Sequence, residues 1–187
     1  MEKSAVIIGG GLGGLFTGAI LSKEGVKVTV IEKNPTVGGG LQSFRRFGET
    51  FDTGMHVIGG MQEGGNIRRI CEYLGIFDKV HVMDVDPDVI DTLYFAEDKK
   101  VYKIAQGKDG FVNALSESFP DQKDNLRSYV DAVYSIVDEL DMFYLRPSQD
   151  FVFVHSEDFM MPADGFIAKY ISDRKLCSVL AYMNPLY

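Results

Sequence analysis

The sequence has few of the residues that build disulfides, metal sites or membrane spans. Its two cysteines, Cys71 and Cys177, fit no metal or redox spacing, so we expect free thiols in a reducing compartment. No apolar run approaches the roughly 20 residues that a membrane span needs. Lys3 and the apolar stretch up to Leu21 have the outline of a signal peptide, but patterned glycines and the strand that follows argue against one.

Basic residues are also too few for a protein that binds nucleic acid or anionic lipid through its charge. The chain has 19 Lys and Arg against 27 Asp and Glu, a formal net charge of -8. This balance argues against general nucleic-acid binding and against a broad electrostatic contact with anionic lipid.

Metal binding is not expected. Asp84, Asp86 and Asp88 alternate as in a calcium loop, but the Gly and the closing Glu of such a loop are missing. His81 and His155 have no partners at ligand spacing, so we interpret both as structural or surface residues.

The N-terminal region has the pattern of a βαβ unit. Ala5–Ile8 is a short apolar run that ends in glycines, as a buried parallel strand does. Leu12–Lys23 keeps apolar residues on one face and stops near Gly25, which predicts a helix. Val26–Ile31 alternates β-branched with polar residues, which predicts a second, parallel strand.

Beyond Glu32 the patterns are mostly antiparallel or helical. We expect a hairpin around Phe44–Phe51, a helix from Asn66 to the stop at Gly75, a hairpin of Val89–Phe95 with Lys100–Ile104, and helices over Gly110–Ser118, from Pro120 to about Tyr144, over Asp164–Ile171 and over Asp173–Met183, with a loop over Arg146–Ala163.

The fold class is therefore α/β: a Rossmann-like βαβ unit, followed by a region of antiparallel hairpins and helices. A doubly wound sheet needs several parallel strands, and no second βαβ follows Glu32. We expect this to be the N-terminal part of a longer chain.

The glycines of the first turn predict a dinucleotide site. Gly9 permits a tight turn, Gly11 lets the backbone approach a pyrophosphate, and Gly14 lets the helix lie close to the strand. The helix start offers N–H groups and a positive dipole end to phosphates. Glu32, at the end of the second strand, can accept hydrogen bonds from ribose hydroxyls. A purely structural glycine-rich turn is the alternative.

NAD and FAD sites share that turn, and the stretch "EKNPTVGGG" favours FAD. Gly38 and Gly39 let the backbone run beside a second part of an extended cofactor, whereas an NAD domain would usually continue into another helix. A flexible loop with accidental glycines is the alternative here.

The motifs "VIIGGGLGGL…VTVIEKNPTVGG" and "FDTGMHVIGG" resemble the FAD-dependent family of phytoene desaturases, carotenoid isomerases and retinol saturases. The residues Phe51, Asp52, Thr53, Gly54, His56 and Gly59, with "SVLAYMNPLY" near the chain end, place the resemblance nearest the retinol saturase and carotenoid isomerase branch. One departure is Gly40, where many relatives have Arg near the flavin phosphates. This argues mildly against an ordinary amine oxidase or phytoene desaturase.

The resemblance implies that the Rossmann-like βαβ unit is FAD-binding and is followed by part of an inserted α+β substrate domain. We accordingly assign residues 1–80 to the FAD-binding segments and residues 81–187 to a partial substrate or cap region, with the C-terminal part of the FAD domain absent.

The resemblance further implies a flavin site around Asp52–His56. Gly54 would let the backbone approach the isoalloxazine ring, with Met55 and His56 close by, and His56 is the candidate catalytic residue for proton transfer. Its alternative role is a hydrogen bond that fixes the loop. The expected cofactor-binding residues are Gly9, Gly11, Leu12, Gly13, Gly14, Glu32, Lys33, Gly38, Gly39, Gly40, Ser43, Gly54, Met55 and His56.

The resemblance also implies an FAD-dependent oxidoreductase that saturates, desaturates or isomerises C=C bonds of a lipophilic isoprenoid, with NAD(P)H as a further electron donor if it is a reductase. An apolar substrate pocket could be lined by Met61, Leu93, Phe95, Phe151 and Phe153, each of which could equally be core. The alternatives are an amine-oxidase-like flavoenzyme and a non-catalytic FAD-binding fragment. We expect the 187-residue chain alone to be inactive, and the protein to be cytoplasmic, with transient membrane contact through its lipid substrate and no nucleic-acid partner.

Overall fold

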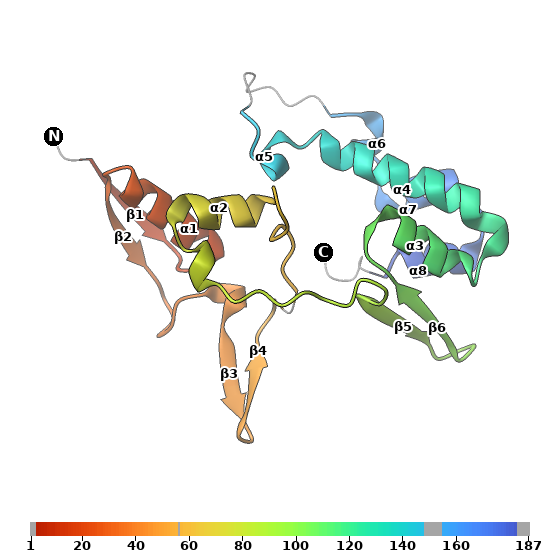
Figure 1. The fold of residues 1–187 in the computed structure, drawn as a ribbon, viewed down its shortest axis with the longest axis horizontal. Coiled ribbons are helices and arrows are strands. Elements are labelled where there is room, and N and C mark those ends of the chain that lie inside the picture. The colour runs from red at the N-terminus through yellow and green to blue at the C-terminus, as the bar shows by residue number, and fades with distance from the viewer. Residues whose placement is uncertain (1–2, 56, 148–154, 183–187) are drawn as a thin grey trace. The chain divides into compact units, whose positions relative to one another are not determined.

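The computed structural model describes residues 3–55, 57–147 and 155–182 and divides the chain into two compact units, residues 1–82 (unit 1) and residues 83–187 (unit 2). Among the described residues each sheet has two strands. Unit 1 contains, in order, β1 (Ser4–Ile8), α1 (Leu12–Lys23), β2 (Lys27–Ile31), η1 (Gly39–Leu41), β3 (Ser43–Arg46), β4 (Glu49–Asp52), α2 (Asn66–Leu74) and η2 (Phe77–Lys79) (Figure 1).

The predicted βαβ unit is present at the N-terminus of unit 1. β1 and β2 pair in parallel, with Ala5 opposite Val28 and Ile7 opposite Val30. Helix α1 covers one face of this pair through the buried Gly18, where an added Cβ would meet Ile7 and Val30 side-chain atoms at 3.4 Å. The absence of a side chain at Gly18 therefore lets the helix pack closely on the strands.

The other face of the β1–β2 pair is exposed and includes three large apolar side chains. Val6, Ile8 and Ile31 are 65%, 88% and 54% exposed, respectively. Among the described residues of unit 1, Cys71 is the one buried hydrophobic side chain. Unit 1 thus has little core of its own, as expected for two parallel strands with one helix between them.

Unit 2 has a compact core between a hairpin and a set of helices. It contains β5 (Asp91–Phe95), β6 (Lys100–Ile104), α3 (Gly107–Ser116), η3 (Pro120–Gln122), α4 (Lys123–Asp138), α5 (Asp141–Tyr144), α6 (Glu157–Met160), α7 (Ala163–Tyr170) and α8 (Arg174–Leu180). Leu115, Leu126 and Leu176 are among its fully buried side chains, and they come from α3, α4 and α8. Tyr102 of β6 stacks on Phe119, with ring centroids 5.5 Å apart.

Two elements of unit 2 differ from the sequence expectation. The long predicted helix is interrupted: α4 ends at Asp138, where Glu139 and Leu140 donate to carbonyls three residues back, and α5 follows. The stretch predicted as loop contains the short helix α6, which begins where the Ser156 hydroxyl accepts from the Phe159 amide at 3.2 Å. Such short segments carry too little apolar periodicity to be predicted.

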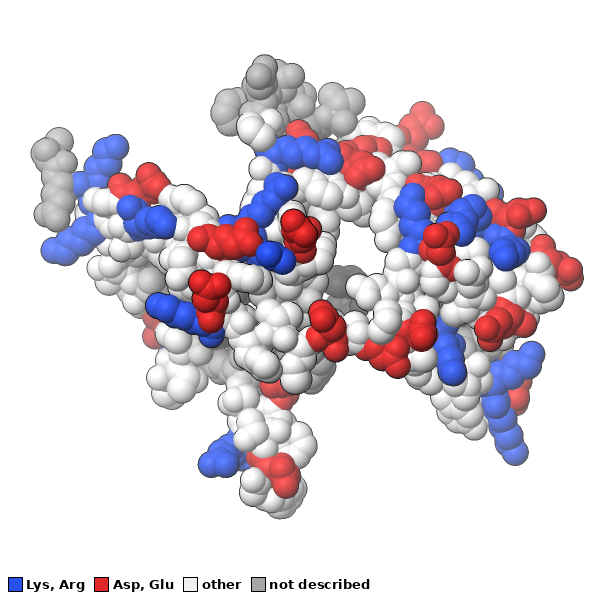
Figure 2. All heavy atoms as spheres, in the orientation of Figure 1, with Lys and Arg blue, Asp and Glu red and all other residues white. Residues whose placement is uncertain are grey.

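Charged side chains of both signs are intermixed on the visible surface of each unit (Figure 2). In unit 2 many of them pair, as in Lys169 with Asp158 at 2.6 Å and Lys175 with Asp98 at 2.9 Å. In the part of the chain that the structure describes, no helix has the length and apolar character needed to cross a membrane.

Candidate functional site

The glycine turn between β1 and α1 is held by close backbone contacts. Gly9 has a φ of +103°, and its N–H donates to the carbonyl of Ile31 at 2.7 Å. The carbonyl of Gly9 then lies so near α1 that a Cβ on Gly14 would be 2.0 Å from its oxygen. This separation is far below any real contact, so the turn requires glycine at Gly14.

The start of α1 presents backbone donors without competing acceptors. Gly11 is the N-cap and contributes no side-chain cap, and the first turn contains no acidic residue. The first-turn amides of a helix, here those of Leu12, Gly13 and Gly14, have no partner within the helix. A Cβ on Gly13 would meet nothing within 4 Å, so this surface is open. The arrangement suits a phosphate, which the helix dipole also favours.

The second glycine bend joins the first directly. Gly38 donates to the carbonyl of Gly10 at 2.7 Å, and Gly11 and Gly38 form a parallel bridge. Gly39 has a φ of +57°, and a Cβ there would lie 3.1 Å from the Cα of Gly11. The two bends therefore form one continuous backbone surface, which we call the glycine seam (residues 9–14 and 38–40).

Glu32 links the glycine seam to the end of β2. One carboxylate oxygen accepts from the Gly10 amide at 2.6 Å and the other from the Asn34 amide at 2.8 Å. The hydrogen bond from Asn34, and then that from Gly10, lowers the pKa of Glu32, so the carboxylate is ionised at neutral pH. An ionised carboxylate has about four acceptor positions. Each carboxylate oxygen can therefore still accept a hydrogen bond from a ribose hydroxyl. The sequence did not predict the hydrogen bonds from the Gly10 and Asn34 amides.

The segment after β4 returns to the far end of the glycine seam. The Met55 amide donates to the Gly40 carbonyl at 3.0 Å, and a Cβ on Gly54 would be 3.6 Å from the same oxygen. The Thr53 hydroxyl donates to the carbonyl of Gln42 at 2.9 Å. The structure therefore places Gly54 and Met55 beside Gly40.

Gln42 and Thr53 also hold the backbone of this site in place. Thr53 belongs to the motif "FDTGMHVIGG", whereas no sequence motif pointed to Gln42. Gln42 closes the preceding loop, because its side-chain amide donates to the Thr36 carbonyl at 2.7 Å. Among the other candidates, Lys33 and Ser43 are exposed. His56 lies outside the described residues.

The remaining titratable candidates lie elsewhere. His81 is exposed, and His155 stacks on Phe159 with centroids 3.9 Å apart and has Nδ1 3.9 Å from Glu139. Within the described ranges no group of His, Cys, Asp and Glu could hold a metal ion. The thiols of Cys71 and Cys177 are free, and burial raises the pKa of each, which makes them poor nucleophiles.

Comparison with known proteins agrees with this geometry. Residues 7–74 match the family described as "NAD(P)-binding Rossmann-like domain", which spans both glycine bends, Glu32 and the segment through Met55. The predicted α/β fold class, with a Rossmann-like unit at the start of the chain, is therefore confirmed. A crystal structure of a protein from Pyrococcus furiosus has a similar fold, with a TM-score of 0.54 and 22% identity over 92% of this chain and 34% of that one.

The curated relatives confirm the family resemblance inferred from the motifs. Prolycopene isomerase 1, chloroplastic, of an Oncidium hybrid cultivar is 28% identical over 98% of this chain and 29% of its own length. The all-trans-retinol 13,14-reductases of Macaca fascicularis and Homo sapiens are each 35% identical over 71% of this chain and 22% of their own length. The chain is thus similar to enzymes of this group and spans less than a third of the length of these relatives.

Proposed function

We propose that the glycine seam binds FAD and that the chain forms part of an oxidoreductase acting on C=C bonds of a lipophilic isoprenoid. The observation that carries the proposal is the direct joining of the two bends. NAD needs the first bend alone, whereas an extended FAD molecule has a use for a second glycine surface continuous with it.

The residues present fit the cofactor. The amides of Leu12, Gly13 and Gly14 would bind the pyrophosphate, and Glu32 would accept from the ribose. Gly40, Gly54 and Met55 would lie against the flavin end, with His56 as the proposed proton donor. When bound, FAD supplies the hydride chemistry, and the protein orients the reactants and excludes water.

The substrate class rests on the names of the relatives. They act, by name, on prolycopene and on all-trans-retinol. Both are neutral isoprenoid polyenes, and both named reactions change the geometry or number of C=C bonds. We extend this class, and not the particular molecule, to the protein of which this chain is a part.

Titration with FAD tests the cofactor assignment. The purified chain should take up one FAD, become yellow, and bleach with dithionite. Gly39→Ala places a methyl group 3.1 Å from Gly11 at positive φ, so we expect at least tenfold weaker FAD binding. The matched control is Gly25→Ala, which lies outside the glycine seam, also has a positive φ (+81°), and adds its methyl group where nothing lies within 4 Å, so it should leave FAD affinity unchanged. A colourless chain that takes up no added FAD would contradict the proposal.

Anaerobic spectra test the substrate class. In the full-length protein of which this chain is a part, a retinoid or carotenoid should reduce the oxidised flavin, oxidise the dithionite-reduced flavin, or be isomerised with no net change of the flavin, whereas an amine should do none of these. A response to amines alone would favour the amine-oxidase-like alternative.

A further inference from the structure

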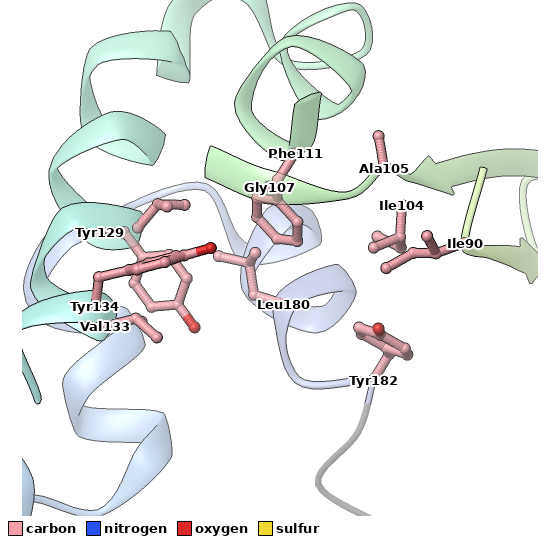
Figure 3. Close-up of a pocket in the computed structure, with 11 residues that line it drawn as sticks. Ile90, Ile104, Ala105, Gly107, Phe111, Tyr129, Val133, Tyr134, Leu180 and Tyr182 are labelled. Carbon is pink, nitrogen blue, oxygen red and sulfur yellow. The ribbon is translucent and has the colours of Figure 1, made fainter. Parts of the chain in front are cut away.

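We infer that unit 2 has its own binding site for a neutral, apolar, ring-sized group, in a cavity of about 330 Å³ between the β5–β6 hairpin and helices α3, α4 and α8 (Figure 3). The inference rests on the proposed function, because it assigns a place to one end of the isoprenoid substrate of that enzyme.

The cavity extends from the solvent to the core of unit 2. Its inner wall includes Ile104 and Val130, which are 2% and 6% exposed. Its rim includes Ile90 and Tyr134, which are 40% and 42% exposed. Side chains from four elements surround it, with Phe111 contributed by α3 (Figure 3). A molecule could therefore enter at the rim and lose most of its contact with water.

The lining is uncharged. No Asp, Glu, Lys or Arg is among the described residues that wall the cavity. Burial raises the pKa of Tyr129, so its phenol stays protonated. Outside the lining, the Lys108 ammonium lies 4.5 Å from the ring centroid of Tyr134, a rim residue, and 2.7 Å from Asp131. Because Lys108 already makes a cation–π contact with the Tyr134 ring, a second cation, such as a substrate amine, is disfavoured at this rim.

The volume selects the size of the ligand. A cavity of about 150 Å³ takes benzene, and this one is roughly twice as large, which corresponds to about a dozen non-hydrogen atoms. An α-helix with its side chains is about 10–12 Å across and does not fit. The cavity suits a hydrocarbon ring with a short chain, which is the end group of many isoprenoids.

Sequence patterns did not identify this site. Tyr129 and Val133 are spaced by four residues on α4, a spacing that indicates ordinary core packing. Of the residues proposed from sequence, Leu93 and Phe95 instead pack against the core of unit 2, Met61 belongs to unit 1, and Phe151 and Phe153 lie outside the described residues.

Calorimetric titration of the 187-residue chain with β-ionone, a neutral isoprenoid ring compound, tests the inference. We expect saturable binding at one site. Val133→Phe should fill the cavity and weaken binding at least tenfold. Val101→Phe is the same substitution at a β6 position that is 52% exposed and outside the lining, and it should leave the affinity unchanged.

Methyl NMR of the unmutated chain provides a second measurement that does not depend on a variant folding. β-Ionone should shift the methyl signals of Ile104, Val133 and Leu180, and leave that of the exposed Val101 in place. Absence of saturable binding, equal affinity in Val133→Phe, or tighter binding of 2-phenylethylamine than of β-ionone would overturn the inference.

Failure of this inference is distinguishable from failure of the proposed function. FAD binding is read separately, from the visible spectrum of the same protein. A chain that binds FAD but not β-ionone overturns the cavity site alone, and a chain that binds β-ionone but not FAD overturns the cofactor assignment alone.

Discussion

Gly14 is the residue of the glycine seam at which one added methyl group should have the largest effect. Its Cβ would lie 2.0 Å from the Gly9 carbonyl oxygen, so Gly14→Ala must displace either α1 or the turn. We expect a loss of about 1–3 kcal/mol in the free energy of unfolding together with weaker FAD binding.

The matched control is Gly13→Ala, whose methyl group meets nothing within 4 Å. Alanine is favoured over glycine inside a helix by roughly 0.5–1 kcal/mol, so this variant should be slightly more stable. Urea unfolding measures the free energy of unfolding of both variants. Equal changes in the two variants would show that the close approach of Gly14 to the Gly9 carbonyl does not constrain the turn.

Glu32 should contribute to stability in a pH-dependent way. Its hydrogen bonds from Asn34 and Gly10 lower its pKa in the folded chain. Its contribution is therefore complete above the pKa of the unfolded chain, near about 4.3, and is lost as the pH falls through the lower folded value.

Glu32→Gln tests this contribution. Urea midpoints measured from neutral pH down to acidic pH should converge for Glu32→Gln and the unmutated chain at the lowest pH. In the same variant we expect FAD affinity to fall roughly tenfold, because a charged acceptor for the ribose is lost. A pH-independent difference in midpoint would contradict the ionised role of Glu32, and unchanged FAD affinity would contradict the ribose role.

At the scale of elements, α8 depends on a side-chain cap. Asp173 is its N-cap and accepts from the Leu176 amide at 2.8 Å, and Leu176 is fully buried. Asp173→Ala should cost about 1 kcal/mol of stability. Asp88→Ala, which removes an exposed carboxylate from a loop, should change stability by less than about 0.5 kcal/mol. Chemical denaturation followed by circular dichroism would show whether the two variants differ.

At the scale of the whole molecule, the two units differ in how much apolar surface they bury. Among the described residues, the buried hydrophobic side chains lie in unit 2, apart from Cys71. We therefore expect amides of unit 2 to be better protected from hydrogen exchange than those of unit 1.

Binding of FAD should reduce the difference in hydrogen-exchange protection between the two units. A ligand that binds only the folded form adds about 2.7 kcal/mol of stability at 100 times its Kd. Exchange measured by mass spectrometry, with and without FAD, should show slower exchange in residues 3–55 and little change in residues 107–138. Equal slowing of exchange in both units would contradict the prediction that FAD binds unit 1 and leaves the core of unit 2 unchanged.

The local parts of the fold were predictable because their signals are local. Glycines between two apolar runs predicted the βαβ unit, and α2 ends at Gly75, which adopts the left-handed conformation expected of a helix stop. The break after α4 and the short helix α6 were not predicted, because both depend on a few hydrogen bonds at helix ends and not on periodicity.

By itself the sequence determined that a dinucleotide turn begins this chain, because small residue size and strand–helix–strand patterning are properties of neighbouring residues. Only the tertiary structure decided that Gly39 lies against Gly11, that Glu32 accepts from Gly10, and that Ile104, Val133 and Leu180 surround one cavity. The physical reason is that these contacts join residues far apart in the chain. Their distances depend on how whole elements pack, which no local pattern encodes.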